Sequence, residues 1–231
     1  MTLNPTKSAA NPDNVISIGK ARFTWLTDRF VRIEWARDGA FEDRPTFAVD
    51  NRHTPAVDWS HSERGGKHIL ASGRLRIEYI DDSRKLSKRN LKATFKLKNK
   101  PVTWRPGQRD KGNLGGTART LDRVLGDRCT LGPGLISRDG WAVHDDSTAI
   151  VLEDIGDRRW PTPRPDGPRQ DLYLLAYGHD FKAALRDAAQ VFGRQPLPPR
   201  YVFGYWWSRF WAYTDNEFEG LVRDFDRHDV P

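Results

Sequence analysis

Short segments in which apolar and polar residues alternate fill the chain between residues 21 and 177. In residues 31–35, Val31, Ile33 and Trp35 share one face, while Arg32 and Glu34 take the other. Alternation with a period of two is typical of a strand with two different faces. Residues 75–79 and 91–97 repeat the pattern.

Two apolar runs lack this alternation, Ala149 to Leu152 and Leu172 to Ala176. Unbroken runs of this length predict strands that are buried on both faces. Many short strands without long helices between them favour an antiparallel β-sandwich, so we expect a mainly β fold.

After Gly178 the spacing of apolar residues changes from two to three and four. Apolar residues spaced by three and four predict a helix with one apolar stripe, ended by Gly193. The residues of this stripe are Phe181, Ala184, Leu185, Ala188 and Phe192.

The segment from Gln195 to Arg200 contains three prolines, which neither a helix nor a central strand accommodates. We therefore place a domain boundary here. The expected organisation is a flexible N-terminus over 1–14, a β-sandwich over 15–195 and a second domain over 196–231.

The second domain begins with a pattern typical of a βα unit. The apolar run Tyr201 to Trp207 predicts a parallel strand buried on both faces. Thr214 and Glu217 have the spacing of a capping box, and residues 218–225 continue as a helical stripe. One strand and one helix cannot bury their own apolar surfaces, so we expect a truncated α/β domain.

The net charge of +7 raises the possibility of nucleic-acid binding. The densest basic stretch, residues 84–100, instead alternates lysines with apolar residues, as expected of a strand with one solvated face. Known nucleic-acid-binding motifs are not found. Nine Trp and 11% aromatic residues indicate a folded protein.

Cys129 has no partner for an intrachain disulfide, and no apolar run resembles a signal-peptide core or a membrane span. These features predict a cytoplasmic protein that does not bind membranes. The scattered histidines have no metal-ligand spacing, and we expect neither a metal nor a cofactor.

Three segments are candidates for binding chemistry. Residues 113–117, followed by 119–122, contain paired glycines that permit close backbone approach but do not form a nucleotide-binding fingerprint. In residues 134–141, Asp139 lies near Trp141, a pairing that binds sugars through a carboxylate and an indole face. A turn with a core tryptophan is the alternative for this segment.

The third candidate is the aromatic segment 205–213, which follows the predicted parallel strand. The C-terminal ends of such strands carry the active sites of (β/α)8 barrels. These rings either bind a ligand or fill a barrel interior.

In this order, the segments 113–117, 134–141, 177–180 and 196–213 resemble glycoside hydrolase family 31, which contains α-glucosidases and α-xylosidases. The resemblance runs from about Asn14 to the last residue. It implies a galactose-mutarotase-like β-sandwich, followed by the first βα unit of a truncated (β/α)8 catalytic barrel. It also implies an oligosaccharide or α-glycoside as substrate.

The resemblance assigns Asp139 to the leaving-group sugar and Phe210 to the pocket for the cleaved sugar, and Arg209, directly before Phe210, is a further candidate for substrate binding. Members of the family are retaining enzymes with two catalytic carboxylates. Neither carboxylate motif is matched in this chain, so we assign no catalytic residue and expect the chain alone to be inactive. A non-catalytic carbohydrate-binding β-sandwich and a basic nucleic-acid-binding protein are the alternatives.

Overall fold

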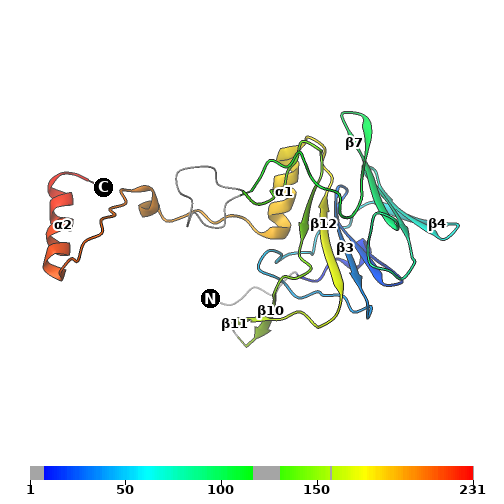
Figure 1. Cartoon of the computed structure of the whole chain (residues 1–231), viewed down its shortest axis with the longest axis horizontal. Coiled ribbons are helices and arrows are strands. Elements are labelled where there is room, and N and C mark those ends of the chain that lie inside the picture. The colour runs from blue at the N-terminus through cyan, green and yellow to red at the C-terminus, as the bar shows by residue number, and fades with distance from the viewer. Residues whose placement is uncertain (1–7, 117–130, 157, 231) are drawn as a thin grey trace. The chain divides into compact units, whose positions relative to one another are not determined.

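The computed structural model describes residues 8–116, 131–156 and 158–230. Cys129 and residues 117 and 119–122 lie outside the described residues. The chain divides into two compact units, Met1–Arg194 and Gln195–Pro231. This division (Figure 1) is one residue away from the boundary predicted from the proline-rich segment.

The described strands of the first unit form two five-stranded sheets and one separate hairpin, with antiparallel pairing throughout. The first sheet, in spatial order, contains β1 (Val15–Ile18), β2 (Ala21–Thr27), β3 (Phe30–Ala36), β12 (Arg169–Leu175) and β9 (Ala142–Asp145). The second contains β4 (Trp59–Arg64), β5 (Lys67–Ser72), β6 (Leu75–Ile80), β7 (Leu91–Leu97) and β8 (Lys100–Trp104). The hairpin consists of β10 (Val151–Ile155) and β11 (Arg158–Thr162).

The main core lies where apolar faces of the two sheets meet. Phe23 and Ile33 come from the first sheet, Ile77 and Phe95 from the second, and all four are buried. The apolar residues of the predicted alternating segments therefore face the core, because successive side chains of a strand point to opposite faces. The predicted antiparallel β-sandwich is confirmed.

A helix covers the other face of the first sheet, so that this sheet is buried on both sides (Figure 1). Helix α1 (Phe181–Phe192) ends before Gly193, as predicted, and Gly193 has φ 88°. Asp180 caps its N-terminus by accepting from the Ala183 amide. The apolar stripe differs in one respect. Leu185 is 46% exposed, whereas Val191 is buried against the sheet.

Burial of the apolar run at 149–152 is also only partial. Val151 is fully buried, but Ile150 is 49% exposed because the run enters the short β10–β11 hairpin rather than a central strand. The run at 172–176 is confirmed as a doubly buried segment of β12 and its extension.

At the N-terminus, the 3₁₀ helix η1 (Pro12–Asn14) precedes β1. Asn14 is buried, and its Nδ2 donates hydrogen bonds to the Thr54 hydroxyl and the Pro55 carbonyl. The predicted flexible segment 1–14 thus includes a residue that is held in the first unit, and residues 1–7 lie outside the described residues.

The second unit contains the 3₁₀ helix η2 (Arg200–Phe203) and helix α2 (Asp215–Arg227). The predicted capping box is confirmed, since Thr214 Oγ1 accepts from the Glu217 amide and Glu217 Oε2 accepts from the Thr214 amide. The strand predicted for 201–207 is wrong. These residues form η2 and irregular backbone, because a strand needs a neighbouring strand to satisfy its amides and carbonyls. In the part of the chain that is described, no helix is long and apolar enough to cross a membrane.

Candidate functional site

Two glycine-rich loop segments of the first unit, 110–116 and 134–141, lie against each other. The Asn113 side chain joins them. Its Oδ1 accepts from the amides of Gly115 at 2.9 Å and Gly134 at 2.7 Å, and its Nδ2 donates to the Gly134 carbonyl at 3.1 Å. Backbone bonds from Leu114 to Ile136 and from Arg138 to Gly112 complete the pairing. We call these residues the paired-loop site.

The carboxylate of Asp139 is held at one oxygen. Oδ2 accepts from the Gly112 amide at 3.2 Å, while the Asp139 amide donates to Ser137 Oγ at 3.0 Å. The Ser137 hydroxyl in turn donates to Asp110 Oδ1 at 2.6 Å. Asp139 Oδ1 accepts no hydrogen bond from the described residues, and the side chain is half-buried. One oxygen of a fixed carboxylate is thus available to accept a bond from a ligand hydroxyl.

The close approach of the two loops depends on glycine. A Cβ at Gly134 would overlap the carbonyl oxygen of Gly115, and a Cβ at Gly112 would lie 2.8 Å from both the amide nitrogen and Oδ1 of Asp139. Gly115 adopts φ +79°, a conformation that glycine enters at little cost. The paired glycines noted in the sequence therefore serve loop-to-loop packing here.

A third segment, residues 177–180, completes the paired-loop site. The Gly178 amide donates to the Gly140 carbonyl at 2.9 Å, and a ring nitrogen of His179, Nε2, donates to the Arg138 carbonyl at 2.8 Å. Three of the four segments that carry the family resemblance therefore meet at one place. Sequence spacing does not reveal these contacts, because Gly140 and Gly178 are 38 positions apart and Arg138 and His179 are 41 positions apart.

Trp141 does not present its ring at this site. It is 3% exposed and belongs to the main core, where its ring centroid lies 6.3 Å from that of Trp104. A sugar that stacks on indole needs a free ring face, which a core position does not offer. The alternative of a turn with a core tryptophan describes this position.

Arg209 and Phe210 belong to the second unit, whereas Asp139 belongs to the first. The Phe210 side chain is fully exposed. The Arg209 guanidinium lies over the Trp211 ring at 4.8 Å from its centroid. Their predicted contact with a sugar stays a prediction.

The remaining buried carboxylates of the first unit are engaged by arginines rather than aimed at a cavity. Asp146 and Asp171 both accept from Arg164 Nη2 at 3.0 Å, and Asp171 also accepts from Arg32. Burial raises the pKa of Asp171, but the charges and hydrogen bonds of Arg32 and nearby arginines outweigh it and hold the pKa at about 2. A carboxyl with this pKa does not donate a proton near neutral pH. Among the described residues, no cluster of three metal-ligating side chains is present.

No protein-family model matches this chain, and no curated protein sequence matches it. Solved structures do match. The GH31 α-xylosidase from a soil metagenome, complexed with xylose, gives a TM-score of 0.59 at 12% identity over 93% of this chain and 38% of that chain. The GH31 α-xylosidase from Xanthomonas citri gives a TM-score of 0.57 at 9% identity, over 95% of this chain and 44% of that chain. The Flavobacterium johnsoniae GH31 dextranase, complexed with glucose, gives a TM-score of 0.53 at 15% identity, over 94% of this chain and 31% of that chain.

The chain therefore spans less than half the length of these enzymes. The resemblance to glycoside hydrolase family 31 predicted from the sequence is confirmed at the level of the fold. The fold is that of an N-terminal portion of such enzymes.

Proposed function

We propose that this chain is the N-terminal part of a retaining α-glycoside hydrolase of the α-glucosidase or α-xylosidase type, which hydrolyses O-glycosyl bonds. The observation that carries the proposal is the fold match to GH31 enzymes over nearly the whole chain. The convergence of three resemblance segments at the paired-loop site supports it independently.

In this proposal, Asp139 contacts the leaving-group sugar. Gly112 fixes Oδ2, so a sugar hydroxyl donates to Oδ1. A hydrogen bond to a charged acceptor contributes about 1.5–3 kcal/mol. The contact favours disaccharides and longer substrates, since a simple aryl leaving group has no hydroxyl at that position.

Residues 196–231 then begin the catalytic (β/α)8 barrel, with α2 as its first helix. In the described structure residues 201–207 form η2 and irregular backbone rather than a strand. Arg209 and Phe210 follow this segment and line the pocket for the cleaved sugar. We also propose a cytoplasmic location, because Cys129 has no disulfide partner in this chain.

The chain by itself is proposed to be inactive. Retaining hydrolysis needs a nucleophile and an acid about 5–5.5 Å apart and open to substrate. The buried pair Asp146 and Asp171 lies under Arg164 and is closed to solvent.

The test compares this chain with the polypeptide encoded when the reading frame continues past Pro231. We expect the 231-residue chain to release no nitrophenol from aryl α-glucosides or α-xylosides. The longer polypeptide should hydrolyse one of them and yield the α-anomer first, as monitored by proton NMR. A longer polypeptide that is inactive, or that yields the β-anomer first, contradicts the proposal.

A non-catalytic carbohydrate-binding sandwich is the second candidate. One observation favours it, the 60% exposed ring of Trp160 on the β10–β11 hairpin, which is free to stack on a sugar. Trp160→Ala should abolish binding of isomaltose or xylose by the 231-residue chain if this candidate is correct. Under the first proposal, Asp139→Ala weakens binding and Trp160→Ala leaves it unchanged.

A further inference from the structure

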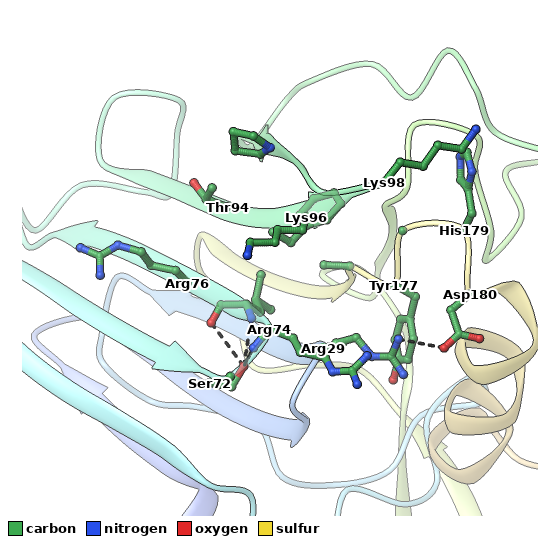
Figure 2. Close-up of a pocket in the computed structure, with 16 residues that line it drawn as sticks. Arg29, Ser72, Arg74, Arg76, Thr94, Lys96, Lys98, Tyr177, His179 and Asp180 are labelled. Atoms are coloured by element: carbon green, nitrogen blue, oxygen red, sulfur yellow. Dashed lines mark hydrogen bonds and ion pairs between the residues drawn. The ribbon is translucent and has the colours of Figure 1, made fainter.

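A concave region of the first unit shares residues 177–180 with the paired-loop site but is not lined by Asp139. It is a pocket of about 580 Å³, bounded by the starts of β6 and β8, the end of β7 and residues 176–180. Figure 2 shows Arg76 and Thr94 at one end and Lys98 and His179 at the other. Small-molecule sites commonly measure about 300–1,000 Å³, so the volume suits a ligand of sugar size.

The charged groups that line the pocket are mostly cationic. They are Arg29, Arg74, Arg76, Lys96 and Lys98, against the single lining carboxylate of Asp180. Positive charge of this density in a concave surface concentrates anions.

Carboxylates pair with the three arginines. Arg29 Nη1 donates to Asp180 Oδ2 at 3.0 Å, as Figure 2 shows. Arg74 lies 3.3 Å from an oxygen of Asp28, and Arg76 lies 3.4 Å from Glu78. The arginines are therefore largely compensated.

The two lysines are not compensated. Among the described residues, neither Lys96 nor Lys98 lies within 4.0 Å of a carboxylate oxygen. Lys96 extends from β7 into the middle of the pocket in Figure 2. The ammonium groups of these two residues are the free positive charge of the pocket.

The position of Lys98 is set by an unusual turn. Lys98 and Asn99 have φ of 48° and 63° and connect β7 to β8, where Leu97 pairs with Lys100. Two-residue hairpins of this conformation favour asparagine and glycine, and a lysine at the first position is held there against its backbone preference. The turn aims a long cationic side chain along the pocket edge.

The rest of the lining suits the body of a polyol. Pro101 supplies exposed apolar surface and Thr94 supplies a hydroxyl group. Phe95 and Tyr177 also line the pocket but are 3% and 6% exposed, and the Ser72 hydroxyl donates to the Asp28 carbonyl at 2.6 Å. Two contacts fix the Tyr177 ring. Its hydroxyl donates to Asp187 Oδ2 at 2.7 Å, and the Arg29 guanidinium lies over the ring, 4.3 Å from its centroid. Apolar surface with a few polar groups binds the C–H face and hydroxyls of a sugar.

We propose that this pocket binds a small organic oxyanion of sugar size, a phosphate or carboxylate group on a polyol, with the Lys96 ammonium group donating to the oxyanion and Lys98 adding positive charge at the edge beside His179. The proposal does not depend on catalysis by the chain. A sugar phosphate and a sugar acid share this chemistry and are separated by the test.

The experiment is titration calorimetry of the 231-residue chain at low salt with glucose 6-phosphate, glucuronate, inorganic phosphate and neutral glucose. The variant Lys96→Ala/Lys98→Ala removes both free charges. The control Lys85→Ala/Lys88→Ala makes the same change of net charge at exposed lysines that do not line the pocket. Melting temperatures of both variants verify that they are folded.

We expect glucose 6-phosphate or glucuronate to bind, and whichever binds more tightly identifies the oxyanion. Binding should weaken at least tenfold in Lys96→Ala/Lys98→Ala, stay within twofold in the control and weaken as salt is raised. The proposal is overturned if neither anion binds, or if the pocket variant binds as tightly as the control. It is also overturned if neutral glucose or inorganic phosphate binds as tightly as the sugar anion.

Discussion

Arg32 and Asp171 form a two-point ion pair across neighbouring strands of the first sheet. Arg32 Nε donates to Oδ1 at 2.8 Å and Nη2 donates to Oδ2 at 2.7 Å. Arg32 lies opposite Tyr173 on β12, two residues from Asp171, so the pair is diagonal and on one face of the sheet. The exposed fractions of the two side chains are 1% and 2%. The sheet therefore carries buried charge on the face away from the main core.

Removing one partner of this pair should be costly. Asp171→Asn leaves the Arg32 guanidinium buried with less compensation, and we expect about 3–5 kcal/mol less free energy of unfolding in urea. The control is Asp38→Asn, which removes the half-exposed partner of Arg169 and should change stability by less than about 1 kcal/mol. If both variants lower the free energy of unfolding by the same small amount, burial of the Arg32–Asp171 pair does not make it more important than an exposed pair.

The same carboxyl predicts a dependence of stability on acid. Its pKa is lowered from 3.8 to about 2 in the folded chain. A lowered folded pKa gives stabilisation that is complete above the unfolded value near 4 and is lost as pH falls through 2. For Asp171 this amounts to about 2 kcal/mol. Unfolding measured from pH 6 to pH 2 should show a shallower acid slope in Asp171→Asn than in Asp38→Asn. Parallel slopes would refute the assignment.

The paired-loop site depends on the absence of a side chain at residue 134. Gly134→Ala places a Cβ on the Gly115 carbonyl, so the loops must separate, at a cost of about 1–3 kcal/mol. Gly73→Ala is the matched control, since a Cβ there meets nothing within 4 Å. We expect a lower melting temperature and amide shifts at Asn113 and Asp139 only in Gly134→Ala. Unchanged shifts would mean that the loops are not packed in this way.

Local patterns in the sequence predicted local structure well. The alternation at 75–79 and the capping box at 214–217 involve neighbours within four residues, and both are confirmed. The sequence pattern did not predict the burial of Arg32, because its guanidinium donates to Glu42, 10 positions away, and to Asp171, 139 positions away. The hub role of Asn113 likewise depends on Gly134, which is 21 residues away. The strand predicted at 201–207 rested on apolar character alone, which does not supply a pairing partner.

Aromatic exposure in the second unit predicts self-association of the chain. Phe203, Trp206 and Phe210 are 76%, 70% and 106% exposed. Contiguous apolar surface beyond a few hundred Å² favours association. A chain ending at Arg194 should keep the melting temperature of the first unit and scatter less light at high concentration than the 231-residue chain. Equal scattering by both chains would show that these rings do not drive association.

Asp139 allows a test that separates substrate contact from loop shaping, carried out in the longer polypeptide of the proposed function. If Oδ1 accepts a bond from the leaving-group sugar, Asp139→Ala should lower kcat/KM for a disaccharide about tenfold or more, equivalent to about 1.5–3 kcal/mol. An activated aryl glycoside, which makes no such bond, should lose much less. Ser137→Ala is the matched variant, because it removes the hydrogen bonds from Ser137 Oγ to Asp110 and from the Asp139 amide while keeping the carboxylate. A loop-shaping role for Asp139 predicts that both variants lower the melting temperature and reduce activity on the two substrates equally. A loss confined to the disaccharide, at an unchanged melting temperature and in Asp139→Ala alone, is the outcome expected if the carboxylate contacts substrate.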